Sequence, residues 1–138
     1  MKFAARVYFI AGIIGLIEII PLYFTESLLG RLFPPAITHP DLYYGFAGVT
    51  LAWQVLFLML ARDPLRYRPL MLATVIEKAS YVGALLVLIA QQRIAPEMLG
   101  AAIQDGTLGI LFLIAYARTA AGVAQQDTRA ARPTAAHH

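Results

Sequence analysis

Four long apolar segments constrain this chain more than any other feature of its sequence. At about 1.5 Å per helical residue, segments of 18 to 24 residues reach roughly 27–36 Å, enough to cross the ~30 Å hydrocarbon core of a bilayer. Each segment is apolar around the whole helix and not along one stripe, the pattern of a helix exposed to lipid. We therefore predict an all-α, up-down bundle of four transmembrane helices. The apolar segments are Val7–Phe24, Leu42–Ala61, Pro69–Gln92 and Met98–Ala117.

The composition supports the same prediction. Of the 138 residues, 59% are hydrophobic and only 14% are charged, whereas a soluble domain is about 45–50% apolar and about 25% charged. The chain contains no cysteine, which excludes disulfides, thiolate metal sites, iron–sulfur clusters and dithiol redox chemistry. The basic residues are not clustered as a nucleic-acid-binding surface requires, so we expect no nucleic-acid partner.

The distribution of basic residues predicts the orientation of the bundle. In membrane proteins, Lys and Arg accumulate in the cytoplasmic connections. Only Arg31 and Arg93 lie on the other side of the predicted bundle, and Lys78 lies inside a span. Both termini are therefore expected in the cytoplasm. The basic residues on the predicted cytoplasmic side are Lys2, Arg6, Arg62, Arg66, Arg68, Arg118, Arg129 and Arg132.

We divide the chain into a transmembrane domain over residues 1–118, with spans at about 5–24, 42–61, 69–92 and 97–117, and a disordered tail over 119–138. The long outer connection, Thr25–Asp41, is expected to hold a short amphipathic helix at the membrane interface. Its apolar face consists of Leu28, Leu29, Leu32 and Phe33. His137 and His138 resemble the start of a purification tag and are left out of the functional interpretation.

Small residues and one proline predict how the spans pack. Each span carries small residues four positions apart, which let helix backbones approach closely in lipid. Pro21 removes a backbone hydrogen bond, so we expect a kink near the outer end of the first span. The small pairs are Ala11/Gly15, Gly48/Ala52, Ala79/Gly83 with Ser80/Ala84, and Ala102/Gly106.

Each span also contains polar residues that lipid does not tolerate. A central charge costs roughly 2.5–3.5 kcal/mol on insertion scales, so these side chains are expected to face the bundle interior. Their estimated depths pair Glu18 with Asp105 on an upper level and Gln54 with Glu77 on a lower one. They are Glu18 in the first span, Gln54 in the second, Glu77 and Lys78 in the third, and Gln104 and Asp105 in the fourth.

The charges of these residues suggest two readings. Three carboxylates and one ammonium would leave a net charge of −2 in the bundle, so at least one carboxyl group is expected to carry a proton, first of all Glu18. The set then forms a polar-lined ligand or proton site, or it only fastens the helices together. Lys78 either snorkels to the nearer interface or pairs with Asp105 or Gln54 on another helix. Glu77 and Lys78 are adjacent and are not expected to face each other.

Aromatic and loop residues add weaker candidates. Trp53 and Tyr81 either wall a cavity or pack between helices. The outer entrance to the second span carries His39, Asp41, Tyr43 and Tyr44, and the tyrosines suit the aromatic belt of the interface. His39 is expected to cap the loop; a metal site shared by His39, Asp41 and Glu18 has too few ligands to be favoured, and we predict no metal or cofactor.

Several short stretches resemble a known group of proteins. These are HPDLYYGFAGVT at His39–Thr50, AWQ at Ala52–Gln54, RDP at Arg62–Pro64, RPLM at Arg68–Met71 and EK at Glu77–Lys78. The chain is similar to small bacterial four-span membrane proteins of the DoxX-like group. The resemblance implies a multi-pass protein of the bacterial inner membrane and a role as accessory subunit of a membrane complex, and it transfers no catalytic residue.

Two further resemblances concern the intramembrane carboxylates. Sterol-isomerase and sigma-two-receptor-type bundles place such groups around an apolar pocket, and Glu18 is similar to the key glutamate in the first span of small multidrug exporters. Our leading hypothesis is a pocket that binds a lipid or a small apolar amine. The alternatives are an accessory or scaffold subunit, with a homodimer or another membrane protein as partner, and a proton-coupled exporter. A lipid or sterol isomerase using a carboxyl group as general acid is ranked last.

Overall fold

The computed structural model describes residues 2–32 and 37–130. The described residues form helices only: α1 (Lys2–Ile19), α2 (Leu22–Leu32), α3 (Pro40–Arg62), α4 (Arg68–Ala90), the 3-10 turn η1 (Pro96–Met98) and α5 (Leu99–Ala130). Three segments are long and apolar enough to cross a membrane: α3, α4 and Pro96–Ala124. Together α1 and α2 make a fourth when they count as one bent span. The chain is thus an all-helical protein with three or four helices able to span a membrane.

Prolines set the boundaries of several helices. Proline lacks a backbone N–H and has a fixed φ, so it fits the first turn of a helix and disrupts the interior. Pro40 and Pro69 stand at the starts of α3 and α4. Pro21 lies between α1 and α2, whose axes differ in direction by 61°, which confirms the predicted kink.

Two predicted boundaries differ from the structure. Helix α2 begins at Leu22 and not within the predicted connection after Thr25, because the helix breaks at Pro21. Phe33, assigned to its apolar face, lies outside the described residues. Helix α5 continues to Ala130, so residues 119–130 are helical where the sequence predicts a disordered tail. Alanine-rich sequence continues a helix without any apolar stripe. Residues 131–138 lie outside the described residues.

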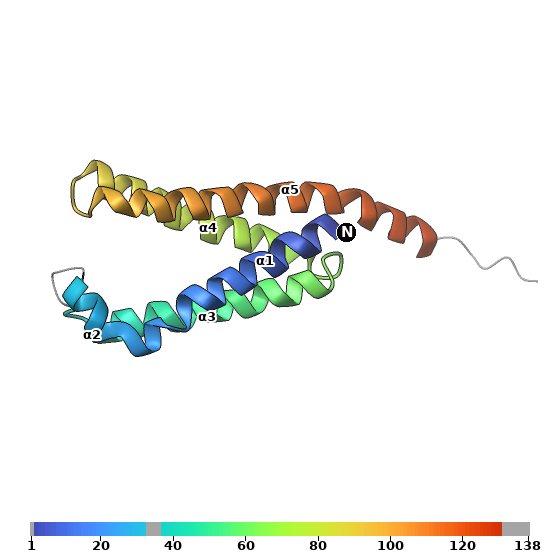
Figure 1. Ribbon diagram of the computed structural model, residues 1–138. Helices are drawn as coiled ribbons and strands as arrows, with labels where there is room; N and C mark the ends of the chain where they lie inside the picture. The colour runs from blue at the N-terminus through green and yellow to red at the C-terminus, as the bar shows by residue number, and fades with distance from the viewer. Residues whose placement is uncertain (1, 33–36, 131–138) are drawn as a thin grey trace, which may run out of the picture.

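The helices form two pairs that diverge. Helix α1 packs along α3 and α4 packs along α5, while α1 and α5 make the main contact between the pairs. The pairs lie close together at the end that carries the N terminus and separate toward the end with α2 and η1 (Figure 1). Helices α3 and α4 have few contacts with each other. The bundle is therefore closed at one end and wider at the other.

An aromatic cluster fills the closed end. The rings of Tyr8 and Phe112 stack with their centroids 4.4 Å apart, and Phe57 meets Phe112 edge-on at 5.0 Å. The hydroxyl groups of Tyr8 and Thr74 share a hydrogen bond of 2.8 Å. These residues come from all four long helices. Aromatic pairs add about 0.5–1.5 kcal/mol beyond the area they bury, so this cluster joins the two pairs where they meet.

Glycines allow the close approach of α1 and α3. A Cβ atom added at Gly12 would lie 2.8 Å from the side chain of Leu58 and 3.2 Å from the backbone oxygen of Gln54. One added at Gly15 would overlap the side-chain amide of Gln54. The pair Ala11/Gly15 thus marks a helix contact as predicted. The pair Ala79/Gly83 does not.

The small residues of α4 mark no close contact with another helix. Ala79, Ser80, Gly83 and Ala84 are exposed. A Cβ atom added at Gly83 or at Gly106 of α5 would have no neighbour within 4 Å. The close approach that small pairs allow is therefore not used at Gly83 and Gly106.

The contact between α1 and α3 makes a prediction about stability. Gly12→Val adds side-chain atoms where Leu58 already packs, and overpacking of this kind costs about 1–3 kcal/mol. The variant should unfold at a lower temperature than the wild type in thermal unfolding of the detergent-purified protein. Gly83→Val is the matched control and should leave the melting temperature unchanged. Equal melting temperatures for the two variants would contradict the close contact.

Candidate functional site

A cavity of about 560 Å³ lies between the two helix pairs, beside the aromatic cluster. All four long helices line it. Much of the wall is apolar, with Ile14, Ile19, Phe46, Val49, Phe57 and Leu108 contributing. Every side chain that the sequence assigned to the membrane interior as a candidate site residue also lines it. These are Glu18, Trp53, Gln54, Glu77, Lys78, Tyr81, Gln104 and Asp105.

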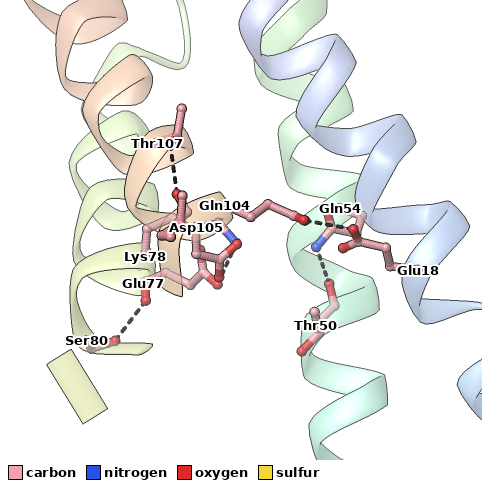
Figure 2. A network of polar contacts seen from close by, with 10 residues as sticks. Glu18, Thr50, Gln54, Glu77, Lys78, Ser80, Gln104, Asp105 and Thr107 are labelled. Atoms are coloured by element: carbon pink, nitrogen blue, oxygen red, sulfur yellow. Dashed lines mark hydrogen bonds and ion pairs between the residues drawn. The ribbon is translucent and has the colours of Figure 1, made fainter. Parts of the chain in front are cut away.

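Lys78 holds two carboxylates on one wall of the cavity. Its Nζ atom lies 3.1 Å from Asp105 Oδ1 on α5 and 3.4 Å from Glu77 Oε1 on its own helix. The Lys78 side chain is only 7% exposed, and those of Asp105 and Glu77 are 15% and 18% exposed. The three groups form a compact cluster on the left in Figure 2. They carry a formal net charge of −1.

This cluster decides between the two alternatives for Lys78, in favour of the pair with Asp105, and corrects the prediction that Glu77 and Lys78 do not face each other. Lys78 does not snorkel to the interface, because it is buried and bonded to a carboxylate of the neighbouring helix. Gly109 makes room for it: a Cβ atom there would lie 3.2 Å from Lys78 Cβ. Glu77 and Lys78 do meet, because their long side chains can bend toward each other although their Cβ atoms point about 100° apart.

Glu18 and Gln104 connect the two helix pairs across the cavity. Gln104 Nε2 on α5 donates a hydrogen bond of 2.7 Å to Glu18 Oε1 on α1. Figure 2 shows the Gln104 side chain extended from the α4–α5 side toward α1. Both residues are exposed. Glu18 thus bonds to the neighbour of Asp105 and not to Asp105 itself, with which the depth estimate paired it.

Gln54 is fixed to its own helix. Its side chain is buried against Gly15. Its Nε2 atom donates a hydrogen bond of 3.1 Å to the backbone oxygen of Thr50, one turn earlier. Gln54 and Glu77, which the depth estimate placed at one level, therefore form no hydrogen bond with each other among the described residues. Glu77 Oε2 is buried and has no hydrogen-bond partner among the described residues.

Aromatic side chains complete the wall. The ring centroids of Phe46 on α3 and Tyr81 on α4 lie 6.5 Å apart, and those of Trp53 and Phe57 lie 6.4 Å apart. Phe46 and Tyr81 thus meet across the side where α3 and α4 have few contacts. Trp53 and Tyr81 line the cavity, and Trp53 also packs on the aromatic cluster.

Thr50, Ser80 and Phe46 are among the lining residues that the sequence analysis did not select. Thr50 lies four positions before Gln54, Ser80 three positions after Glu77, and Phe46 four positions before Thr50. Residues three or four apart share a helix face. The same periodicity that placed the charged residues inside would have identified them.

The predicted outer entrance lies apart from the cavity. The hydroxyl group of Tyr43 donates to the backbone oxygen of Leu22 at 2.7 Å, and that of Tyr44 donates to Glu26 at 2.9 Å, so both tyrosines hold α2 against α3. His39 precedes α3 but makes no capping hydrogen bond through its side chain. Asp41 is exposed. Among the described residues, no group of histidine and acidic residues is arranged to hold a metal ion.

Comparison with models of protein families, with curated proteins and with solved structures finds no match to this chain. The geometry of the cavity is therefore the basis for a functional interpretation.

The Lys78–Asp105 pair makes a prediction about stability. Removing one partner of a buried ion pair costs about 3–5 kcal/mol, whereas replacing both partners by apolar groups costs much less. Lys78→Met should therefore lower the melting temperature strongly, and adding Asp105→Leu should restore part of the loss, since Glu77 still lacks its cation. Thermal unfolding of the single and double variants tests this. Additive losses in the double variant would show that the two side chains do not interact.

Proposed function

We propose that this protein binds a lipid or a small apolar amine in the cavity between its helix pairs, with a carboxylate facing the ligand. The observation that carries the proposal is the charge of the site. Glu18, Glu77 and Asp105 carry three formal negative charges, and Lys78 is the one cation among the lining residues. Lys78 bonds Glu77 and Asp105, while Glu18 is bonded by the neutral amide of Gln104. The ammonium group of a ligand would supply the positive partner that the Glu18 carboxylate lacks.

The size and walls of the cavity support this ligand class. A volume of about 560 Å³ falls within the range of about 300–1,000 Å³ typical of small-molecule sites. Such sites are mainly apolar and fix the ligand with a few placed polar groups. Here the apolar wall would hold the hydrocarbon part of the ligand, and Glu18 would bind its charged end.

The proposal includes a membrane setting. With α1 and α2 as one bent span, the chain crosses the membrane four times, and the basic residues place both termini on the cytoplasmic side. In this arrangement the wider end of the bundle faces outward. An inner membrane of a bacterium fits this topology.

An exporter is the second candidate. The helix pairs diverge at one end only (Figure 1), as one state of an alternating-access transporter would. It predicts uptake of a cationic substrate into vesicles driven by a pH gradient and abolished by Glu18→Gln. Binding without such uptake would favour the ligand-binding function alone.

The binding proposal predicts selectivity for a cation over a neutral molecule of the same shape. We expect 1-adamantylamine to change the fluorescence of Trp53, the single tryptophan of the chain, saturably and at concentrations about tenfold lower than 1-adamantanol requires. Hydrogen bonds to charged groups contribute about 1.5–3 kcal/mol. The lower end of this range corresponds to about tenfold in affinity. Glu18→Gln should remove the preference for the amine.

The matched control is Glu97→Gln, which removes an exposed carboxylate that does not line the cavity. It should leave both titrations unchanged. Equal binding of amine and alcohol to the wild type, or no binding of either, would contradict the proposal. The absence of binding would turn attention to an accessory role with a protein partner.

A further inference from the structure

The Glu18–Gln104 hydrogen bond crosses the cavity at an open part of it and not at a buried one. Both residues are exposed, although both also line the cavity. They come from α1 and α5, the helices that make the main contact between the two pairs. The cavity is therefore open beside Glu18 and Gln104, and a hydrogen bond between these two side chains joins α1 to α5 there.

The surface around this opening is apolar. Next to Glu18, Ile17 is 68% exposed and Ile14, which also lines the cavity, is 38% exposed. Next to Gln104, Ile103 is 62% exposed. Exposed isoleucines on both sides place this part of the helices at the depth of the hydrocarbon chains. Glu18 lies about 24 Å along α1 from Lys2, by the helical rise of about 1.5 Å per residue.

An exposed carboxylate at this depth needs a positive partner. Ionisable residues within membranes normally face the bundle interior or pair with an opposite charge. Glu18 lines the cavity but is exposed, its hydrogen-bond donor is a neutral amide, and it forms no ion pair among the described residues. The bond to Gln104 satisfies one oxygen of the carboxylate but leaves its charge uncompensated.

We infer that the opening beside Glu18 and Gln104 admits a lipid-dissolved amphiphile with a cationic head, and that its ammonium group takes the place of Gln104 on Glu18. This inference rests on the proposed function and specifies its ligand: a long-chain amine that enters from the bilayer. The chain of the ligand lies along Ile14 and the apolar wall, and its head lies at Glu18. Gln104 closes the opening when no ligand is bound.

The role of Gln104 has a distinctive consequence. Because its amide competes with the ligand for Glu18, removing it should strengthen binding, whereas removing a residue that contacts the ligand would weaken binding. A typical hydrogen bond contributes about 1 kcal/mol net, which corresponds to about fivefold in affinity. We therefore expect Gln104→Ala to bind a long-chain amine about fivefold more tightly than the wild type.

The experiment uses the protein in phosphatidylcholine vesicles and the quenching of Trp53 by brominated chains. The probes are 9,10-dibromooctadecylamine and the corresponding dibrominated octadecanol, which differ only in the head group. Trp53 lines the cavity, so a chain that enters it quenches the fluorescence. The amine should quench at about tenfold lower content in the bilayer than the alcohol, because only the amine pairs with the carboxylate.

The variants separate the inference from its alternatives. Glu18→Gln should abolish the preference for the amine, and Gln104→Ala should increase amine quenching. Thr107→Ala, an exposed position one turn from Gln104 that does not line the cavity, should change nothing. Equal quenching by both probes, or weaker amine quenching in Gln104→Ala, would overturn the inference.

The same preparation distinguishes the two failures. If 1-adamantylamine binds and the brominated amine does not compete with it, the cavity binds amines but does not admit them from the bilayer, and only the inference fails. If neither amine binds, the proposed function itself fails.

Discussion

The ammonium group of Lys78 is the constraint on which the structure depends. It lies about 15 Å along α4, near the middle of a span, where an uncompensated charge is most costly. The bundle meets this cost by pairing Lys78 with Asp105 of α5 at 3.1 Å and Glu77 at 3.4 Å. The pairing joins α4 to α5 and fixes the rotation of both helices. With that rotation, Gln104 points across the interior toward Glu18 (Figure 2).

The cavity results from a contrast between the two ends of the bundle. At the closed end, Tyr8, Phe57 and Phe112 fill the space between the helix pairs, and Tyr8 is tied to Thr74. At the other end, α3 and α4 have few contacts with each other. The carboxylates there would repel one another if the helix pairs packed closely. Apolar side chains alone favour no particular separation in lipid, because lipid tails are as apolar as leucine. Close packing at one end and charged groups at the other leave the space between them open.

The sequence predicted which polar residues line the interior, but not which of them bond to one another. The four apolar segments, the kink at Pro21 and the shared interior position of the polar residues follow from the cost of polar groups in lipid, which is a property of each helix alone. Which polar groups meet depends on the rotation of one helix against another. That rotation is set by contacts such as Gly109 against Lys78 and Gly15 against Gln54. The depth estimate from the helical rise therefore placed Glu18 and Asp105 at one level, while the structure bonds Glu18 to Gln104.

The interior between the helix pairs is an open, charged cavity and not a packed core. The most direct measurement is an experimental structure of the protein in a lipid bilayer that shows side chains between Glu18 and Asp105. We expect this structure to show an intact Lys78–Asp105 pair and elongated density in the cavity that ends at Glu18. A closed interior, with Glu18 paired to a protein cation and no space beside Trp53, would show that these polar residues only fasten the helices together.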